Sequence, residues 1–366
     1  MYLVAFILSL YVILIIIYRI GWEKLSNFKE VEYTPFVSVV IAMRNESKHV
    51  NRLLEEITNQ MYSKKKYEII IVNDHSTDET LELLHQFKSP LIKVFSLQEN
   101  EGGKKRAVKK AVSIAKGDII ITTDADCSVK PYWISKIAAC FIDKKIKLVA
   151  GPVAFYNSNN IFCDLQSLEF SSLIGSSAGA IGVNRAILCN GANMAFRKNV
   201  FLSKDNISND KIVSGDDVFL LHSLKRLYKE SVFFIKDQDA IVMTQASITL
   251  SEFINQRKRW AAKSVKYKDL DTVFVSYLIL LTNLTFVALL IATIINFDLF
   301  FLFALFYFIK FTVDFLILYP VLNFFNRKDL LKWILPFEII YSFYIIFIVL
   351  NSFSSSFIWK DRTHIK

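Results

Sequence analysis

The sequence predicts an α/β domain, with a mainly parallel mixed sheet and helices on both faces, flanked by membrane-spanning helices. Three observations predict it: an apolar stretch towards each end of the chain, a strand–helix alternation between them, and acidic residues that directly follow apolar strands. Such alternation is typical of parallel sheets. Hydrophobic residues make up 53% of the 366 positions. Soluble domains usually contain about 45–50%, so we expect part of the chain to lie in a membrane.

The first apolar stretch is long enough to form a transmembrane helix. Residues Tyr2–Ile20 are almost uninterruptedly apolar, and about 20 helical residues cross a hydrocarbon layer of ~30 Å. A signal peptide is the alternative, but the stretch lacks a basic start and no small-residue cleavage site follows it. Arg19, Lys24 and Lys29 lie at its far side, which predicts that this side is cytoplasmic. We therefore expect a transmembrane helix in residues 1–22.

Strands and helices alternate in the middle of the chain, and we expect one domain over residues 36–250. The apolar runs that predict strands are Val37–Ala42, Glu68–Val72, Leu91–Phe95, Asp118–Thr123 and Leu148–Val153. The segments that predict helices between and after them are Ser47–Asn59, Asp78–Phe87, Lys104–Ala115, Pro131–Phe141 and Asp216–Leu227. The segment Phe162–Gly182 is rich in Ser, Gly and Ala and fits either a helix or a flexible flap.

An amphipathic basic helix is expected next, within residues 251–268. Its helical part, Ser251–Ser264, leads directly into the second apolar stretch and could lie in the membrane interface. That stretch, residues 273–357, predicts about three apolar helices, near Val273–Ile295, Leu299–Leu322 and Trp333–Asn351. Three crossings after a cytoplasmic domain would leave the tail outside, whereas the basic tail residues Lys360, Arg362 and Lys366 favour the inside. Either one apolar segment does not cross, or the tail is an exception to the rule.

Two charged residues fall inside the second of these three apolar segments. Lys310 and Asp314 are four residues apart and therefore share one helical face. A lone charge at the centre of a bilayer costs about 2.5–3.5 kcal/mol. An internal ion pair explains both residues, and a polar contact with a lipid-linked substrate is the alternative.

The chain is basic, with a formal net charge of +10. Basic residues cluster at Lys64–Lys66, Lys104–Arg106 and Arg257–Lys268. Because the last cluster adjoins a predicted membrane helix, we expect anionic lipid rather than nucleic acid as the partner. The four cysteines have no CxxC spacing and the five histidines form no metal-spaced pair, so the cysteines are expected to be small, buried, reduced residues.

Acidic residues follow two of the predicted parallel strands. Asp124 and Asp126 end the run that starts at Asp118, and Asp74 follows the strand Glu68–Val72. Because parallel strands share a direction, these acids should lie on one edge of the sheet, where open α/β sheets bind ligands. Two carboxylates one residue apart suit a divalent cation carrying phosphates. We expect Asp126 to hold the cation on a diphosphate and Asp74 to accept hydrogen bonds from a base or ribose.

Two further features extend this prediction. The helix that begins at Lys104 offers free N–H groups and positive charge for the diphosphate. The acidic pair Asp216-Asp217 precedes another helix. Each acidic feature also has a purely structural reading, with Asp74 as a turn residue, Asp78 as a helix cap, and Asp216-Asp217 as favourable charge at a helix start.

The sequence Gln-Arg-Lys-Arg-Trp at 256–260 is the last candidate element. On a helix, Gln256 shares a face with Arg259 and Trp260. The Arg259 guanidinium suits a departing diphosphate, because it binds phosphate oxygens bidentately. Trp260 offers a flat face for a sugar ring or a lipid chain. An amphipathic helix on a membrane surface would carry similar residues and is the alternative.

These motifs together resemble those of the membrane-bound family-2 glycosyltransferases. The resemblance rests on VSVVIAMRNE (37–46), NDHSTD (73–78), Asp124-Ala-Asp126, GANMAFRK (191–198), Gly215-Asp216-Asp217 and QRKRW (256–260). The order and spacing match over nearly all of the region between the apolar ends. Two motifs differ from the more usual form, since Asn73-Asp74 replaces an aspartate pair and Gly-Asp-Asp replaces Thr-Glu-Asp. Both keep the second carboxylate.

The resemblance implies a GT-A nucleotide-diphosphosugar fold and a role for each matching residue. The implied catalytic residues are Asp217, as general base, and its neighbour Asp216. The implied donor-binding residues are Asn45, Glu46, Asp74, Lys104, Asp124 and Asp126, with Asp126 as the ligand of Mg²⁺ or Mn²⁺. The implied acceptor and diphosphate residues are Asn193, Gln256, Arg259 and Trp260.

The expected function is therefore that of an inverting hexosyltransferase. It would move a sugar from a nucleotide-diphosphate sugar, expected to be a UDP-sugar, to a lipid or lipid-linked acceptor. The expected location is the inner (plasma) membrane, with several crossings and a cytoplasmic catalytic domain, and no nucleic acid partner. A processive polysaccharide synthase is the alternative within the family. A membrane-bound nucleotidyltransferase is the alternative from another class, because it also uses paired carboxylates and Mg²⁺, and a nucleotide-binding receptor is a third.

Overall fold

The computed structural model describes the chain except residues 26–32, 203–215, 265, 353–355, 360–361 and 366. It divides into two units, each of which is built from separate stretches of sequence. The sheet unit comprises Leu25–Tyr156 and Leu188–Gln245, and the helical unit comprises Met1–Lys24, Asn157–Ile187 and Ala246–Lys366. The segment expected as one domain, residues 36–250, therefore contributes to both units.

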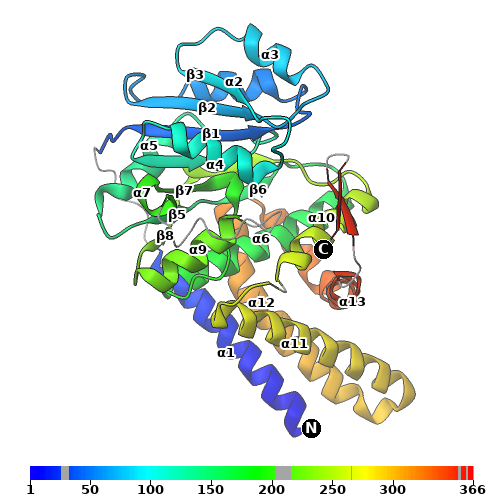
Figure 1. Cartoon of the computed structure of the whole chain (residues 1–366). Coiled ribbons are helices and arrows are strands. Elements are labelled where there is room, and N and C mark those ends of the chain that lie inside the picture. The colour runs from blue at the N-terminus through cyan, green and yellow to red at the C-terminus, as the bar shows by residue number, and fades with distance from the viewer. Residues whose placement is uncertain (26–32, 203–215, 265, 353–355, 360–361, 366) are drawn as a thin grey trace. The chain divides into compact units, whose positions relative to one another are not determined.

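The sheet unit is built on a seven-stranded mixed sheet, as the sequence predicts. Its strand order is β3-β2-β1-β4-β7-β5-β8 (Figure 1). The strands are β1 (Val37–Met43), β2 (Tyr67–Asn73), β3 (Ile92–Ser96), β4 (Ile119–Thr122), β5 (Leu148–Ala150), β7 (Met194–Arg197) and β8 (Val232–Phe234). Strands β1 to β4 pair in parallel. The central strands β1, β2 and β4 are almost wholly buried, which is why they read as continuous apolar runs.

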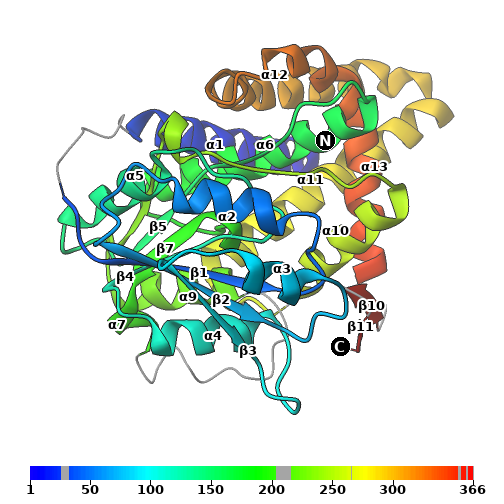
Figure 2. The same cartoon turned by 90° about the horizontal axis from the view of Figure 1, so that it is seen from above.

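Helices cover both faces of this sheet. They are α2 (Val50–Thr58), α3 (Thr80–Gln86), α4 (Lys104–Ile114), α5 (Trp133–Ala139), α7 (Lys198–Phe201) and α9 (Asp216–Leu227), with short 3-10 turns η1 (Cys140–Ile142), η2 (Gly191–Asn193) and η3 (Gln238–Ala240). Figure 2 shows α2 and α5 on one side of the strands and α4 on the other. The Gln60 side chain, just after α2, joins α2 to α5. Its amide donates to the carbonyl oxygen of Lys130 and accepts from the Ile134 N–H at the start of α5.

The fifth predicted strand differs from the structure. Leu148–Val153 was expected as one strand, but it forms β5 and the separate strand β6 (Val153–Phe155), which pairs with β9 (Val242–Thr244). Gly151 and Pro152 lie between them. The Gly151 N–H still donates to the carbonyl of Asn193, at 2.8 Å. Pro152 has no N–H to donate to a ladder, so the chain leaves the main sheet after Gly151.

Strand β7 is not anticipated by the sequence, and it runs antiparallel to both of its neighbours, β4 and β5. Its first residue, Met194, pairs with the last residue of β4, Thr122. An antiparallel neighbour starts where its partner ends. Residues just before β7 are thereby brought to the edge of the sheet at which β4 ends.

The opposite, amino-terminal edge of the sheet is held by the buried carboxylate of Glu68. This side chain is 4% exposed and accepts from Lys93 Nζ at 2.6 Å, Ser38 Oγ at 2.7 Å and the Lys116 N–H at 2.6 Å. Burial alone would raise the pKa of Glu68, but these donors outweigh it and lower the pKa below its ordinary value. One ionised carboxylate thus ties β1, β2, β3 and the segment before β4 together.

The helical unit contains the apolar helices that the sequence predicts. They are α1 (Tyr2–Lys24), α11 (Leu270–Ile295), α12 (Phe300–Phe324) and α13 (Ile334–Ser352), joined by the 3-10 turns η4 (Phe297–Leu299) and η5 (Lys328–Trp333). Four helical segments of the described chain, Tyr2–Lys24, Leu270–Ile295, Phe297–Phe324 and Lys328–Asn351, are long and apolar enough to cross a membrane. Helices α1, α11 and α12 pack side by side (Figure 1).

The remaining elements of this unit are two helices and a hairpin. They are α6 (Ile161–Gly182), α10 (Leu250–Ser264), and the antiparallel strands β10 (Ser356–Trp359) and β11 (Arg362–Ile365). Of the two alternatives for residues 162–182, the helix is correct. The expected amphipathic helix is also present as α10.

Helix α6 packs against α1 through glycines. A Cβ atom added at Gly179 would lie 2.3 Å from the carbonyl oxygen of Tyr18, and one added at Gly21 would lie 1.9 Å from the carbonyl oxygen of Gly179. Both distances are far below van der Waals contact. Small residues allow helix backbones to approach this closely. The Ser-, Gly- and Ala-rich composition of α6 therefore serves helix packing.

The charged pair within the apolar helices is an internal ion pair, as predicted. Lys310 Nζ lies 2.8 Å from Asp314 Oδ2 and also contacts Glu338 of α13. The Tyr11 hydroxyl of α1 donates to Asp314 Oδ1 at 2.5 Å. Lys310 is only 1% exposed. A buried charge needs paired partners, and here they come from three helices, so the network also fixes how these helices meet.

Replacing Glu68 with glutamine should destabilise the sheet unit in a pH-dependent way. Because the pKa of Glu68 is lowered on folding, the ionised carboxylate contributes stability above its unfolded pKa of about 4.3. That contribution is lost as the pH falls through the lower folded-state pKa. At pH 7 we expect Glu68→Gln to reduce the free energy of unfolding by about 1–3 kcal/mol, measured by thermal unfolding of the detergent-solubilised protein.

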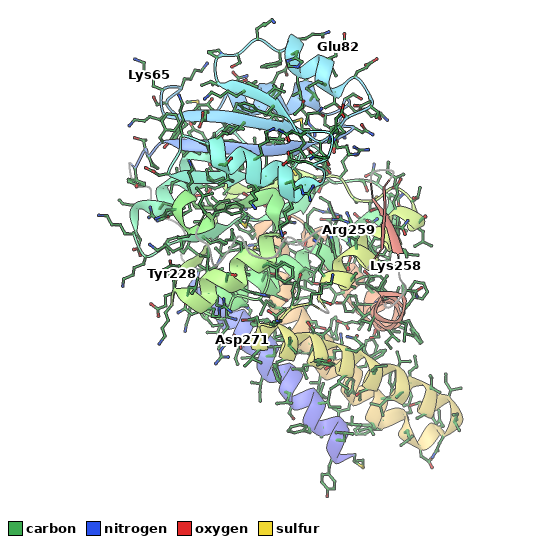
Figure 3. The ribbon with its side chains drawn as sticks, viewed as in Figure 1. Lys65, Glu82, Tyr228, Lys258, Arg259 and Asp271 are labelled. Atoms are coloured by element: carbon green, nitrogen blue, oxygen red, sulfur yellow. The ribbon has the colours of Figure 1, made fainter. Side chains whose placement is uncertain are left out.

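The control for this prediction is Glu82→Gln on α3. Glu82 is an exposed glutamate (labelled in Figure 3) whose described hydrogen bond comes from Gln86 at 3.0 Å. We expect no measurable effect from it. A Glu68→Gln deficit that stays constant from pH 7 to pH 3 would contradict the assignment of this stability to the ionised carboxylate.

Candidate functional site

The candidate site forms at the edge of the sheet where β1, β2 and β4 end. Asp74 directly follows β2, and Asp124 comes two residues after β4. The strand order places β1 between these two strands, and all three run in the same direction. The two acids therefore lie on one edge, as the sequence predicts. Asp74 is 2% exposed, whereas Asp124 is partly open to solvent.

The start of α4 connects Asp74 to Asp124. The Gly103 N–H donates to Asp74 Oδ2 at 3.0 Å, and the next residue, Lys104, forms an ion pair with Asp124 Oδ1. Gly103 has φ of +98°, a conformation that glycine adopts readily and other residues do not. This turn brings two consecutive residues to two different strand ends. The predicted donor-binding residues Asp74, Lys104 and Asp124 are thus assembled in one place.

The loops after β1 and β2 are joined by several hydrogen bonds. Arg44 donates to the carbonyl oxygens of Asp74 and His75 at 2.8 and 2.9 Å. Asn45 Oδ1 accepts from the Thr77 N–H at 2.8 Å, and the Glu46 N–H donates to Thr80 Oγ1 at 2.7 Å. The predicted residues Asn45 and Glu46 therefore lie beside the loop that carries Asp74.

Asp78 strengthens the same connection. Its carboxylate accepts from Thr80 on one oxygen and from the Ser47 N–H on the other. Burial alone would raise the pKa of Asp78, but these hydrogen bonds outweigh it and lower the pKa to about 2. Asp78 thus fixes the loop geometry before α3, whose N-cap residue is Glu79 rather than Asp78.

Asp126 is oriented by three neighbours. Its carbonyl oxygen accepts from Arg52 at 3.0 Å, and its Oδ2 accepts from the Thr244 hydroxyl at 3.2 Å. The following residue, Cys127, is buried, and its thiol lies 3.9 Å from Asp126 Oδ1. Burial, and then the nearby carboxylates of Asp124 and Asp126, raise the pKa of this thiol well above its usual range. The thiol therefore stays protonated.

Asp217 is brought to the same edge by the turn that precedes β7. Its Oδ2 accepts from the Gly191 N–H at 3.0 Å, and its Oδ1 accepts from the Val218 N–H at 2.9 Å. The Gly191 carbonyl in turn accepts from Thr122 Oγ1 at 2.8 Å. Thr122 is the last residue of β4, two positions before Asp124. Asp216 begins α9, but its side chain and Gly215 lie outside the described residues.

Asn193 lies in the same turn but faces the interior. It is 0% exposed. Its amide donates to the carbonyls of Pro152 and Ala240 at 2.8 Å each and accepts from Trp133 Nε1 at 3.0 Å. These bonds use both N–H donors of the amide and one lone pair of its oxygen, so the side chain holds the turn that presents Gly191. Its expected contact with the acceptor or the diphosphate stays a prediction.

The residues Gln256, Arg259 and Trp260 lie on α10 in the helical unit. Each is partly exposed. Figure 3 labels Arg259 and its neighbour Lys258 on this helix. The Trp260 ring lies 6.1 Å from the ring of Phe170 on α6, at an angle of 34°.

The carboxylates of the sheet unit fit a cation that arrives with its phosphates. Among the described residues, no group of three His, Cys, Asp or Glu side chains is placed to hold a metal. Mg²⁺, however, is commonly bound by one or two carboxylates and completed by substrate phosphates and water. Asp126 Oδ1 and Oδ2 accept only a weak thiol contact and one hydroxyl among the described bonds, so Asp126 suits that role.

An open hollow of about 720 Å³ occurs at the other edge of the sheet, near the amino ends of β1, β2 and β3. Its lining includes five lysines, namely Lys64, Lys65, Lys88, Lys93 and Lys116. Lys93 is paired with Glu68. Ligands of open α/β sheets bind at the carboxyl ends of the strands, so this hollow is separate from the candidate site.

Several contributors to the site escape prediction from the sequence. They are the Gly103 and Gly191 N–H groups, Thr122, Thr244 and Arg44. Backbone N–H groups leave no mark in a sequence. Thr122 does leave one, because it is a buried hydroxyl at the end of an otherwise apolar strand, and buried hydroxyls need a partner.

Comparison with known proteins finds one matching family and several relatives. The family described as "Glycosyl transferase family 2" matches residues 38–203. A beta-monoglucosyldiacylglycerol synthase of Nostoc sp. is 28% identical over 238 residues, which cover 62% of this chain and 48% of the relative. A poly-beta-1,6-N-acetyl-D-glucosamine synthase of Staphylococcus aureus is 33% identical over 162 residues, covering 43% of this chain and 37% of the relative. The chain thus spans less than half the length of these curated relatives.

A solved structure supports the fold. The mannosyltransferase PcManGT from Pyrobaculum calidifontis, solved in complex with GDP-Man and Mn²⁺, aligns with a TM-score of 0.57 at 16% sequence identity. The alignment covers 89% of this chain and 99% of that protein. The fold is therefore GT-A, as the motifs imply. Residues 38–203 match the model of glycosyl transferase family 2, and the GT-A fold agrees with that match.

Proposed function

We propose that the protein is an inverting glycosyltransferase of the inner membrane face. It takes a sugar from a nucleotide-diphosphate sugar, for which we propose a UDP-sugar, and transfers it to a lipid or lipid-linked acceptor. In this proposal the protein crosses the plasma membrane several times and its catalytic domain is cytoplasmic, because Arg19 and Lys24 end α1 and Arg327, Lys328 and Lys332 lie between α12 and α13.

One observation supports this proposal above all others. A continuous set of contacts links three acids that are far apart in the sequence: Asp74 to Gly103 and Lys104, Lys104 to Asp124, and, through Thr122 and Gly191, the end of β4 to Asp217. Transfer from a nucleotide sugar needs a nucleotide contact, a diphosphate site and a base within reach of one ligand. In this proposal Asp74 supplies the nucleotide contact and Asp217 the base, and Lys104, which pairs with Asp124, belongs to the diphosphate site.

The donor is held by residues at the ends of β2 and β4. In this proposal Asp74, with Asn45 and Glu46 beside it, contacts the nucleoside, and Asp124 binds the sugar. Lys104 and the N–H groups at the start of α4 face the diphosphate, since helix N-termini favour anions. Asp126 would hold Mg²⁺ or Mn²⁺, which would neutralise the negative charge that develops on the leaving diphosphate.

Asp217 acts as the general base. The backbone N–H groups of Gly191 and Val218 each donate to one of its oxygens, which fixes the carboxylate while each oxygen keeps a further lone pair. Asp217 removes the proton from the acceptor hydroxyl as that oxygen attacks the anomeric carbon, and the sugar–diphosphate bond breaks on the opposite face. Asn193 keeps the Gly191 turn in place. Asp216 precedes the base and is proposed to support it.

The remaining contacts are proposed to come from residues of α10. Arg259 is proposed to bind the departing diphosphate, and Gln256 and Trp260 to meet the acceptor end. A lipid acceptor is consistent with the four helices of the described chain that are able to cross a membrane and with a relative that is named a beta-monoglucosyldiacylglycerol synthase.

A processive polysaccharide synthase is the second candidate, favoured by the relative named poly-beta-1,6-N-acetyl-D-glucosamine synthase. The two functions differ in product length. Detergent-solubilised protein is incubated with a radiolabelled UDP-sugar and a lipid extract, and the products are separated on a denaturing gel. We expect one labelled lipid species. A ladder of increasing length would replace the first proposal with the second, and release of pyrophosphate would instead indicate a nucleotidyltransferase.

Replacing Asp217 with asparagine should remove the base while leaving the donor site intact. A positioned base contributes about 10²–10⁴-fold to the rate, so we expect kcat to fall by that factor. The affinity for the nucleotide sugar should stay within twofold, measured by calorimetry. Near-wild-type turnover by Asp217→Asn would refute the role of this residue.

Replacing Asp126 with asparagine should instead weaken donor binding that depends on a divalent cation. We expect the affinity for the UDP-sugar in the presence of Mn²⁺ to fall at least tenfold, because a metal ligand is lost, and to change little without Mn²⁺. Calorimetry with and without the cation gives both values. Asp118→Asn is the matched control, since Asp118 is an exposed acid at the opposite end of the same strand. Equal effects of both substitutions would contradict the proposal.

A further inference from the structure

One of the cationic side chains in the segment Gln256–Trp260 points into the protein. Arg257 is 3% exposed, and it pairs with Glu169 of α6, which is 5% exposed. Arg257 Nε lies 3.1 and 3.0 Å from the two carboxylate oxygens, and one of its terminal nitrogens lies 2.5 Å from Oε2. A guanidinium that meets a carboxylate through two nitrogens is held in both position and orientation.

Glu169 is in turn fixed by a third helix. The hydroxyl of Tyr344 on α13 donates to Glu169 Oε1 at 2.9 Å. The carboxylate therefore accepts from α10 and α13 while it belongs to α6. The buried carboxylate of Glu169 is thus paired with Arg257 and also accepts from Tyr344, so the three helices are joined at one point.

Arg257 also contacts two of the three residues assigned to the acceptor and diphosphate. Its remaining terminal nitrogen donates to Gln256 Oε1. The guanidinium carbon lies 4.2 Å from the centre of the Trp260 ring and 4.6 Å from that of Phe253, which is stacking distance for a cation on an aromatic face. Arg257 thus contacts both the Gln256 and the Trp260 side chains.

We propose that Glu169 and Arg257 are positioning residues for the transfer reaction. Glu169 anchors Arg257, and Arg257 orients Gln256 and Trp260 and sets the rotation of α10 about its axis. Contact with the leaving diphosphate then belongs to Arg259, and Arg257 takes no part in it. This inference rests on the proposed function, in which Gln256, Arg259 and Trp260 meet the substrates.

The test uses the whole chain in detergent and compares two substitutions on α6 that each replace a carboxylate with an amide, Glu169→Gln and Asp164→Asn. Glu169→Gln keeps the shape of the side chain but removes the charge that orients Arg257. Misplacing a substrate contact by about 1 Å can cost 10²-fold in rate, so we expect kcat to fall at least tenfold and the KM for the acceptor to rise. Affinity for the nucleotide sugar should remain unchanged. Arg257→Lys keeps a charge but loses the planar fork, and we expect an intermediate loss.

Asp164→Asn is the matched control. Asp164 also lies on α6 and also pairs with an arginine, Arg327, at 2.7 Å, but it has no described contact with α10. We expect it to lower the thermal stability comparably and to leave kcat within twofold. If Glu169→Gln lowers kcat no more than Asp164→Asn does, the proposal is overturned.

A second readout reports on Trp260 without any substrate. Moving the Arg257 guanidinium off the indole should change the intrinsic fluorescence of Glu169→Gln, and the change should vanish in a Trp260→Phe background. Unchanged emission, or a change that persists without Trp260, would overturn the positioning role. A wild-type protein that transfers no sugar from any nucleotide sugar would instead refute the proposed function, and the fluorescence result would still decide whether Glu169 and Arg257 position Trp260.

Discussion

The candidate site depends on one turn, in which Gly103 and Lys104 meet two different strand ends. The sheet alone places Asp74 and Asp124 on the same edge, but β1 lies between their strands. The Gly103 N–H and the Lys104 ammonium each contact one acid, so the start of α4 sets the spacing between them. A glycine with positive φ is needed, because a side chain at that backbone conformation would be strained. Residues recruited from later in the chain are added to this framework.

Much of the sheet edge is predictable from the sequence because two simple rules fix it. Buried parallel strands read as apolar runs, and parallel strands end on the same side. The positions of Asp74, Asp124 and Asp126 follow from these rules. Strand β7 does not, because four residues are too few for a pattern and its antiparallel pairing is decided by tertiary contacts. The place of Asp217 depends on the turn before β7, so only the resemblance to a family indicates its role.

The direction of a side chain is harder to predict than its place in the chain. Asn193 and Gln256 both belong to recognisable motifs. Gln256 is partly exposed, whereas Asn193 is buried and bonded to Trp133, Pro152 and Ala240. Arg257 and Arg259 differ by two positions on one helix, and only the packing of α6 against α10 decides that Arg257 is buried. Likewise, the spacing of Lys310 and Asp314 predicts their pairing, whereas the contributions of Glu338 and Tyr11 require knowledge of how the helices pack.

The close approach of α1 and α6 leaves these helices almost no room for sequence variation. At Gly21, Gly179 and Gly182 the neighbouring atom is a backbone carbonyl, which cannot change rotamer to make space as a side chain could. Even one methyl group is barred, so evolutionary drift at these sites should be slower than at large core residues, which tolerate exchange for others of similar volume. Glycine also has no side-chain entropy to lose when the helices associate. The two helices therefore associate at these glycines without that entropic loss, and backbone contacts rather than side chains determine the geometry of their crossing.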